Sequence, residues 1–377
     1  MSIHCVVDKE KFLEILSGVQ NVTNKKNTMA ILSNILLQLE NSKLTITATD
    51  MEVCLQFSME AQEMLAGSIT LPSKKLYEIV RVSNSSTIEI KEMENNWAAI
   101  KAGASIYNLA GMASAEYPEI PKLEEKKGIK AASVIFLELI DKTQHSIAGE
   151  QENIYSLTSA LIDIDEKEGQ TLIRMVTSDG HRLSVMEKIV SNEMMQLKDG
   201  SGLILVPRRG IQEMKKYCES RDEIDICLEN TQLFISDDKS MLVIRLKKGE
   251  YPPYKTIIET IQKKHRVTVE REKFIQALIR SDLFTRDAYH TIRLDLSRDN
   301  ITLFSENFEL GNSKEELPVK YEDEDLTLGF NCRYFIETLE VMEGGEVYMY
   351  LDGKDSACCF TSDADQGFLS IIMPMNI

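Results

Sequence analysis

Hydrophobic positions in the first third of the chain switch between a helical and an extended pattern. Between residues 12 and 19, apolar side chains recur at i, i+3, i+4 and i+7, which predicts an amphipathic helix with one buried face. Residues 44–50 alternate apolar and polar side chains, so we expect a strand there. A second helix is predicted over residues 72–81, where a proline stands near the first turn. Further strands are predicted at residues 35–39, 87–91, 98–101 and 105–109.

The same order of elements recurs twice more along the chain. In each round an acidic residue ends a predicted strand, namely Asp50, Asp179 and Glu306. The interval of about 125 residues is the size of a domain rather than of a short stacking repeat. Chance periodicity is the alternative, but we interpret the pattern as three similar α+β units. The helices predicted in the later rounds cover residues 136–143, 207–216, 270–278 and 330–339.

A stretch in the middle of the chain carries a turn signal between two strand-like runs. Residues 177–185 read Thr-Ser-Asp-Gly-His-Arg-Leu-Ser-Val, and apolar runs precede and follow them. An Asp-Gly pair in this setting predicts a short hairpin turn in which both residues have positive φ. The turn would hold His181 and Arg182 at the rim of a sheet. Such a corner could be catalytic, could dock a partner, or could be only a turn.

Composition places the chain among folded proteins with more than one core. Of its 377 residues, 43% are hydrophobic and 27% are charged, which is unlike a disordered chain. No apolar run approaches the roughly 18 residues of a membrane helix, and the first 12 residues lack the apolar core of a signal peptide. The seven cysteines include no Cys-x-x-Cys pair, which is typical of reduced thiols. We therefore expect a cytoplasmic protein without membrane contact.

The total charge and the local distribution of charge give opposite indications about a nucleic-acid partner. The net charge of −17 argues against a polyanionic partner for the average surface, although a local basic face can exist within an acidic total. Basic residues recur on the second predicted helix of each unit, and this recurrence favours contact with phosphates over a merely solvated helix face. Because aromatic residues do not interleave with them, no readout of base sequence is expected. The candidate DNA-facing residues are Lys25, Lys26, Lys74, Lys75, Arg81, Arg208, Arg209, Lys215, Lys216 and Arg333.

Signatures of common enzyme classes do not occur in the sequence. It contains no Gly-x-Gly-x-x-Gly, no phosphate-binding Gly-Lys-Ser/Thr loop, no Gly-x-Ser-x-Gly and no His-Glu-x-x-His. Dispersed histidines and cysteines predict no metal site. Asp179 and His181 could act as an acid–base pair, but residues two apart on a turn need not face each other. An uncharacterised enzyme that uses this pair is the alternative function.

Five short motifs, spread over all three units, carry a resemblance to a known family. They are Ala48-Thr49-Asp50-Met51-Glu52, Thr177-Ser178-Asp179-Gly180-His181-Arg182-Leu183, Val206-Pro207-Arg208-Arg209-Gly210, Gly329-Phe330-Asn331 and Met373-Pro374-Met375. In this combination and order the chain resembles the bacterial sliding clamps, the beta subunits of DNA polymerase III. The resemblance covers essentially the whole chain.

The resemblance implies a fold and a way of working. Three similar domains of the clamp fold, each with two helices and antiparallel sheets, would cover residues 1–127, 128–258 and 259–377. Two chains would pair head to tail into a six-domain ring around double-stranded DNA. Such a protein is a processivity factor and not an enzyme. It needs no cofactor, because a separate clamp loader uses the ATP.

The resemblance also implies a docking pocket between the second and third domains. There the DNA polymerase III alpha subunit, the clamp loader and other clamp-binding proteins would bind by a short peptide. Ring closure would set Tyr107 and Leu109 of one chain against Leu283 and Phe284 of the other. The matching pocket positions are Leu157, Ser178, Gly180, His181, Arg182, Leu183, Pro252, Asn331, Tyr334, Ile371, Ile372, Met373, Pro374 and Met375.

Several pocket positions depart from the family pattern. The chain ends in Asn376-Ile377 where Arg-Leu is usual, and Thr256 stands where a basic residue is common. Ser156 replaces a common aromatic residue, and Ser178 a usual threonine. These changes concern the choice of peptide rather than the fold, and they would suit a divergent or second-copy clamp.

An acidic protein can serve as such a ring without binding DNA tightly. A topological link retains the protein, while phosphate contacts from a modestly basic inner face are screened by salt and permit sliding. A free-standing DNA-binding protein would differ, because it would bind short linear duplex tightly and with strong dependence on salt.

Overall fold

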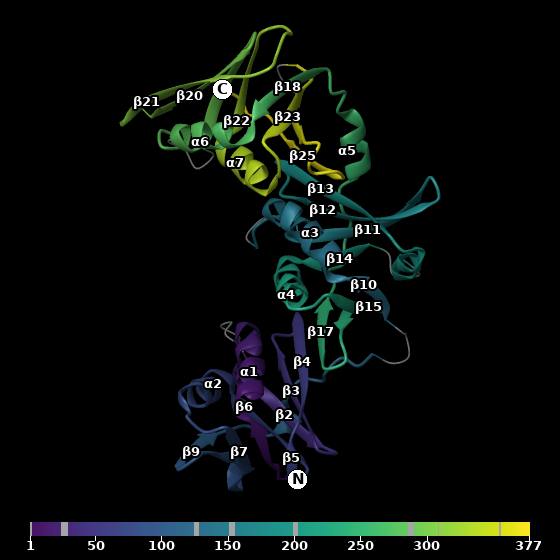
Figure 1. Ribbon diagram of the computed structural model, residues 1–377, viewed down its shortest axis with the longest axis vertical. Coiled ribbons are helices and arrows are strands. Elements are labelled where there is room, and N and C mark those ends of the chain that lie inside the picture. The colour runs from purple at the N-terminus through teal and green to yellow at the C-terminus, as the bar shows by residue number, and fades with distance from the viewer. Residues whose placement is uncertain are drawn as a thin grey trace. The chain divides into compact units, whose positions relative to one another are not determined.

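The computed structural model describes residues 2–23, 29–123, 128–150, 155–198, 203–285, 290–307, 309–353 and 356–377 (Figure 1). The chain divides into two compact units. The first comprises Met1–Ser133 and Gln212–Leu246, and the second comprises Val134–Ile211 and Lys247–Ile377. Each unit contains one eight-stranded antiparallel sheet and one smaller sheet. Short 3-10 helices occur at Ala30–Ser33, Glu94–Asn96, Ser114–Glu116, Gln144–Ser146, Tyr155–Thr158 and Asn192–Lys198.

The first unit is built on a sheet of order β10-β15-β16-β17-β4-β3-β2-β6, with a second sheet of order β5-β1-β7-β8-β9. Its helices are α1 (Lys9–Thr23) and α2 (Ser73–Val82), and α4 (Arg208–Glu219) precedes its last strands. The strands are β1 His4–Asp8, β2 Asn34–Glu40, β3 Lys43–Thr49, β4 Val53–Glu60, β5 Gln62–Leu65, β6 Gly67–Pro72, β7 Thr87–Glu92, β8 Trp97–Ala102, β9 Ser105–Ala110, β10 Ile129–Ala132, β15 Glu223–Glu229, β16 Gln232–Ser236 and β17 Ser240–Arg245.

Helix α1 covers one face of this large sheet. It buries Phe12, Leu16 and Val19, and it packs against α2, β3 and β4. On the opposite face, Cys54 and Val243 form an apolar cluster with Phe234. The sheet reaches eight strands because β17 pairs with β4 in antiparallel register. One continuous sheet therefore joins segments nearly two hundred residues apart in the sequence.

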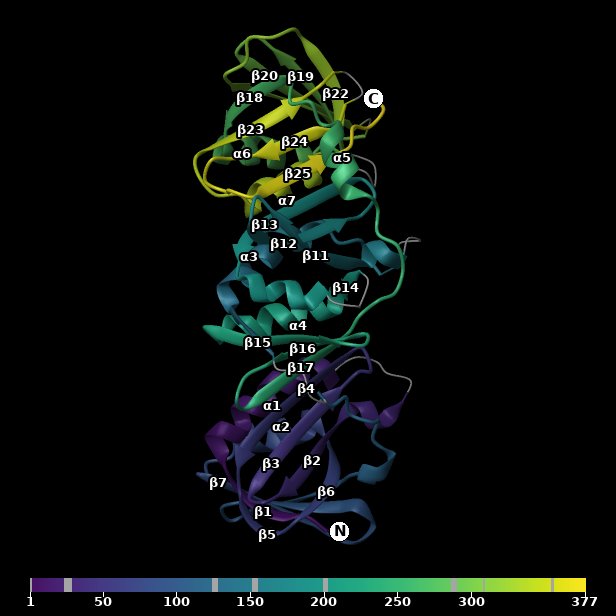
Figure 2. The ribbon, with the colours of Figure 1, turned by 90° about the vertical axis from the view of Figure 1, so that its right-hand side faces the viewer.

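The second unit repeats the plan with a sheet of order β14-β11-β12-β13-β25-β24-β23-β18 and a sheet of order β21-β20-β19-β22 (Figure 2). Its helices are α3 Ser133–Thr143, α5 Tyr254–Thr260, α6 Arg271–Asp282 and α7 Cys332–Val341. The strands are β11 Ser159–Lys167, β12 Gln170–Ser178, β13 Arg182–Val190, β14 Ile204–Pro207, β18 His265–Glu270, β19 Thr291–Ser297, β20 Asn300–Asn307, β21 Gly311–Pro318, β22 Leu326–Asn331, β23 Glu346–Leu351, β24 Cys358–Thr361 and β25 Phe368–Ile372.

The predicted helices are all present, with four starts corrected. Pro72, Pro207 and Glu270 each end a strand, so α2, α4 and α6 begin one residue later than predicted. Helices α1, α2, α3, α4 and α6 contain the stretches in which apolar residues recur at helical spacing. The helix predicted from residue 330 begins at Cys332 instead, because Phe330 and Asn331 belong to β22. The Asn331 side chain caps α7 by accepting hydrogen bonds from the amides of Arg333 and Tyr334. Three repeated rounds of helix and antiparallel sheet confirm the predicted α+β class.

In each round, a side chain at the end of a strand accepts hydrogen bonds from the turn that follows. The residue predicted for this place in the third round lies one position too early in the sequence. The Asp50 Oδ1 accepts hydrogen bonds from the amides two and three residues further on, at 3.0 and 2.8 Å. Asp179 does the same, at 3.0 Å for both bonds. In the third round the equivalent residue is Asn307, at 3.0 and 3.2 Å, and not Glu306. An amide oxygen can replace a carboxylate here because the turn needs only an acceptor.

Candidate functional site

The corner between β12 and β13 is a three-residue loop rather than the predicted two-residue turn. Only Gly180 of the Asp-Gly pair has a positive φ, of 90°. The Ser178 hydroxyl donates to the Arg182 carbonyl at 2.7 Å and accepts from the Gly180 amide at 3.1 Å. A Cβ on Gly180 would lie 3.8 Å from the Leu157 side chain. Side-chain hydrogen bonds therefore fix the corner, and Leu157 lies next to Gly180.

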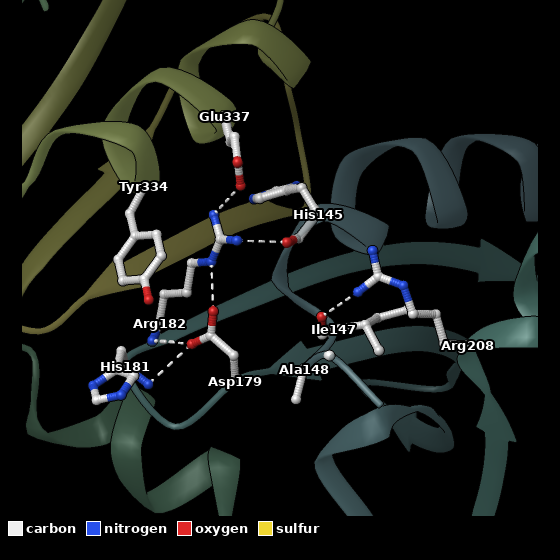
Figure 3. Close-up of a pocket in the computed structure, with 10 residues that line it drawn as sticks. His145, Ile147, Ala148, Asp179, His181, Arg182, Arg208, Tyr334 and Glu337 are labelled. Carbon is white, nitrogen blue, oxygen red and sulfur yellow. Dashed lines mark hydrogen bonds and ion pairs between the residues drawn. The ribbon is translucent and has the colours of Figure 1, made fainter. Parts of the chain in front are cut away.

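Arg182 is the centre of a buried polar cluster at this corner (Figure 3). It is 8% exposed, and its guanidinium contacts Asp179 at 2.9 Å and Glu337 at 2.6 Å. It also donates to the His145 carbonyl at 2.6 Å, and it lies 4.3 Å from the centroid of the Tyr334 ring. A buried guanidinium needs such partners to offset the loss of hydration. The cluster thus ties β13 to α7.

His145 lies beside this guanidinium in an electrically neutral state. Burial, and secondarily the charge of Arg182, lower the pKa of His145 from 6.5 to about 3. Its Nε2 lies 3.2 Å from the Ser184 hydroxyl. Asp179, the proposed acid of the enzyme alternative, contacts His181 through the backbone amide of that residue and is paired with Arg182. These contacts describe a rigid polar support, and they do not favour an acid–base pair.

The end of the chain lies against the same corner. Strand β25 pairs with β13, with Leu183 opposite Ile371. Beyond β25, the Met373 amide donates to the His181 carbonyl at 2.9 Å, and the Met375 amide donates to the Gly329 carbonyl at 2.8 Å. A Cβ on Gly329 would lie 2.5 Å from the Met375 carbonyl oxygen, so the close approach requires glycine. The structure therefore brings together three motifs that are far apart in the sequence.

An apolar floor extends across the strands next to this corner. Its buried members share one face of the sheet, because side chains two residues apart in a strand point the same way. Register places Leu161 opposite Val176, and Ile371 between Leu183 and Cys359. Partly buried residues of α5 and the preceding segment pack on it. The floor comprises Leu161, Val176, Leu183, Val185, Leu205, Cys359 and Ile371, and the buried Tyr254 of α5 packs with it.

The predicted pocket residues fall into three groups by exposure. Buried members are Leu157, Ser178, Arg182, Leu183, Asn331, Ile371 and Ile372. Half-buried members are Pro252, Tyr334, Pro374 and Met375, whereas Gly180, His181 and Met373 are exposed. Ile372 differs from its neighbour, because alternation turns it to the opposite face of the sheet from the floor. Of that pair, only Ile371 belongs to the apolar floor.

A cavity of about 430 Å³ opens beside the cluster, on the side of α7. Most of its lining residues are polar, among them Arg208 and Glu337, and Ile147 and Ala148 also line it. The Arg208 guanidinium donates to the Ile147 carbonyl at 2.7 Å (Figure 3). Sequence reasoning assigned Arg208 to DNA contact and missed both His145 and Glu337. A lone histidine and one glutamate on a helix give no signal in the sequence until the fold places them beside Arg182.

The candidate DNA-facing residues lie on α2, α4 and α7, except Lys25 and Lys26, which lie outside the described residues. Exposed members are Lys74, Lys75, Arg81, Lys216 and Arg333, whereas Arg208, Arg209 and Lys215 are half-buried. Several are already paired within the chain. Lys75 contacts Glu78 at 2.6 Å, Lys216 contacts Glu213 at 2.8 Å, and Arg333 contacts Asp282 at 3.3 Å.

The residues expected at a chain–chain contact lie at sheet edges or beside them. Tyr107 and Leu109 belong to β9, the edge strand of the five-stranded sheet, and Tyr107 is 37% exposed. Leu283 follows α6 and is 70% exposed, whereas Phe284 is half-buried. Helix α6 packs against β21, the edge strand of the four-stranded sheet. An edge strand leaves backbone groups free to pair with another chain.

The described residues contain neither a candidate metal site nor a candidate membrane helix. No group of His, Cys, Asp and Glu there could hold a metal ion. No helix in that part of the chain is long and apolar enough to cross a membrane.

Comparisons with known proteins match the whole length of the chain. Residues 3–121, 131–253 and 257–376 match the N-terminal, central and C-terminal domain families of the DNA polymerase III beta subunit, respectively. The chain belongs to the DNA polymerase III beta subunit family. The resemblance inferred from the five motifs is thereby confirmed, as is the presence of three clamp domains.

Individual clamp proteins are similar over nearly their full length. The beta sliding clamp of Haemophilus influenzae is 28% identical, covering 98% of this chain and 99% of that protein. That of Pseudomonas aeruginosa is 28% identical over the whole of both chains. Among solved structures, a Caulobacter crescentus beta sliding clamp has a TM-score of 0.91 at 26% identity and covers 100% of both chains. The DNA polymerase III subunit beta of Pseudomonas aeruginosa has a TM-score of 0.90.

Proposed function

We propose that this protein is a homodimeric sliding clamp that encircles double-stranded DNA and holds DNA polymerase III on it. Full-length similarity to beta sliding clamps supports the role in replication. In this proposal the clamp domains cover residues 1–127, 128–258 and 259–377. The protein has no catalytic activity of its own and works in the cytoplasm.

One observation carries the docking part of the proposal. The apolar floor lies beside the Arg182 cluster, and the end of the chain is tied to both. The segment that follows β25 leaves Met373 exposed and Pro374 and Met375 half-buried next to this floor. Apolar side chains beside a few fixed polar groups suit a short peptide with apolar anchors. The partners of this pocket would be the alpha subunit of DNA polymerase III, the clamp loader and other clamp-binding proteins. A Pseudomonas aeruginosa clamp has been solved bound to griselimycin, and we infer that this ligand would compete for the same pocket here.

The basic helices and the sheet edges carry the ring part of the proposal. Lys74, Arg81, Lys216 and Arg333 would face DNA phosphates without reading base sequence, together with the other basic residues predicted above. The edge at β9 of one protomer would meet the region of α6 and β21 of its partner, with Leu283 buried in the contact. Because the ring is topological, the acidic total charge does not oppose retention on DNA.

A binding experiment tests the docking pocket. The tracer is a fluorescein-labelled peptide that spans the clamp-binding segment of a DNA polymerase III alpha subunit, with griselimycin as competitor. Met373→Ala is expected to weaken tracer binding at least about fivefold, because an apolar anchor contact is removed. Met64→Ala is the matched control, since Met64 on β5 is 47% exposed and Met373 is 48% exposed. Equal affinity of the two variants would refute the assignment of the pocket.

A further inference from the structure

A row of charged residues crosses the eight-stranded sheet of the second unit beside the apolar floor. Register places Asp163 on β11 opposite Arg174 on β12, and Arg174 opposite Glu187 on β13. Arg174 is 9% exposed, pairs with Glu187, and lies 3.8 Å from Asp163 and 3.6 Å from Asp165. Alternation puts this row on the same face as Leu161, Val176 and Val185 of the floor.

Helix α5 is fastened to this charged row at its first turn. The buried Tyr254 donates its hydroxyl hydrogen to Asp163 at 2.5 Å. The next residue, Lys255, contacts Asp163 at 3.1 Å and Asp165 at 2.8 Å. Hydrogen bonding to Lys255 lowers the pKa of the Asp165 carboxyl, so the acid is charged and the pair is an ion pair at neutral pH. Just before the helix, Tyr251 donates to the Val176 carbonyl at 3.2 Å.

The rest of α5 lies on the apolar floor. Ile257 and Ile258 of α5 and its C-cap residue Ile261 pack against the cluster that contains Val176, Leu183 and Ile371. The helix has only seven residues, and its N-cap residue Pro253 provides no side-chain cap. So short a helix has little stability of its own in water. Its position over the floor must come from its tertiary contacts, and the charged row supplies the polar ones.

We propose that Asp163, Arg174, Tyr254 and Lys255 are positioning residues for the docking pocket. They hold α5 over the apolar floor beside the predicted pocket residue Pro252. Asp163, Arg174 and Lys255 lie in the charged row, whereas the Tyr254 ring packs with the floor. This inference rests on the proposed docking function. It makes the affinity for a peptide depend on contacts made along the outer part of β11 and β12.

For the pair of Lys255 and Asp165, exposure separates this role from a role in folding. The side chains of Lys255 and Asp165 are 52% and 38% exposed, and pairs so exposed contribute little to global stability. Removing the ion pair between Lys255 and Asp165 should leave the fold intact, while α5 becomes more mobile. A peptide that must then order α5 on binding loses affinity, because part of its binding free energy goes into that ordering.

The variants Tyr254→Phe and Lys255→Met test the role in the full-length protein, with the alpha-subunit tracer as probe. Each keeps the apolar part of its side chain, so the floor stays covered. We expect tracer binding to weaken about fivefold or more, the low end of usual coupling between sites. Amide hydrogen exchange over residues 254–260 should quicken, while dimer content and the thermal midpoint stay close to those of the wild type.

Asp295→Asn is the matched control, because Asp295 on β19 forms an ion pair with Arg293 at 3.0 Å and does not belong to α5 or the floor. This variant should bind the tracer as the wild type does. Failure of the wild type to bind the tracer would overturn the docking pocket itself. If the wild type binds and both α5 variants bind equally well with unchanged exchange, the pocket stands and the positioning role is refuted.

Discussion

Arg182 shows how single residues shape the site. Its guanidinium has acceptors on Asp179, Glu337 and the His145 backbone, and its flat face meets the Tyr334 ring. Those partners come from the corner of β12 and β13, from α7 and from the segment after α3. A planar fork of donors can satisfy such a set, whereas a lysine ammonium could not. The Arg182 side chain therefore connects the corner between β12 and β13 to helix α7.

The neutral state of His145 makes the stability of the protein depend on pH. Its pKa is lowered to about 3 in the folded chain, whereas an unfolded histidine has the ordinary value of 6.5. Below pH 6.5 the unfolded chain binds the proton more readily, so this residue reduces the free energy of unfolding as the pH falls. The slope approaches about 1.4 kcal/mol per pH unit until the folded pKa is reached.

Urea unfolding of the wild type and of His145→Gln between pH 7 and pH 5 measures this effect. The variant lacks the titrating group, so the wild type should lose about 2 kcal/mol relative to it over that range. The other titrating groups are shared and cancel in the difference. A difference between the two proteins that stays constant with pH would contradict the assignment.

At the scale of elements, α3 and α7 are joined by a buried lysine. Lys142 on α3 is 4% exposed and donates to the Val341 carbonyl at the end of α7, at 2.6 Å. It also contacts Asp365, which lies just before β25 and whose side chain is 1% exposed. Asp365 further accepts from the Ser362 hydroxyl and the Glu343 amide. The contacts of Lys142 therefore hold α3 and the end of α7 together on one face of the eight-stranded sheet of the second unit.

Lys142→Met should lower the free energy of unfolding by about 3–5 kcal/mol, because it leaves the Asp365 carboxylate buried without a cation. The double variant Lys142→Met/Asp365→Asn removes both charges and should recover part of that loss. Urea midpoints of the three proteins provide the measurement. A double variant no more stable than the single one would show that the charge of Asp365 is not the cause.

Prediction from sequence succeeded where a pattern is local. The period of apolar residues located α1, α2, α3, α4 and α6, and the repeated order gave the three rounds. It missed what depends on contacts distant in sequence, such as the pairing of β17 with β4. The start of α7 was placed too early, because the apolar Phe330 fits a buried strand as well as a helix.

The candidate site was predictable in part for the same reason. The motifs around Gly180 and Met373 located the corner and the end of the chain that lies against it. The predicted turn type was wrong, because the Asp179 carboxylate supports a longer loop that needs positive φ only at Gly180. Tyr254 and Glu337 carried no signal, since their role comes entirely from neighbours that the fold supplies.

At the scale of the whole molecule, two chains are needed to close a ring. Leu283 is 70% exposed, so Leu283→Asp should cost the single chain little and should break the dimer by burying a charge at an apolar contact. Sedimentation velocity at micromolar concentration gives the readout. Ile189→Asp is the control, since Ile189 on β13 is 60% exposed. A Leu283→Asp protein that sediments like the wild type would place the interface elsewhere.

The central claim is a topological link to DNA, and retention on circles tests it most directly. Protein is loaded onto nicked circular duplex by a clamp loader and ATP, and a single restriction cut linearises the DNA in one half of the sample. Both halves are then passed through a gel-filtration column in high salt. We predict that the protein elutes with the uncut circles and separates from the linear DNA, because salt weakens phosphate contacts but does not open a ring. Equal loss from circular and linear DNA would contradict the account.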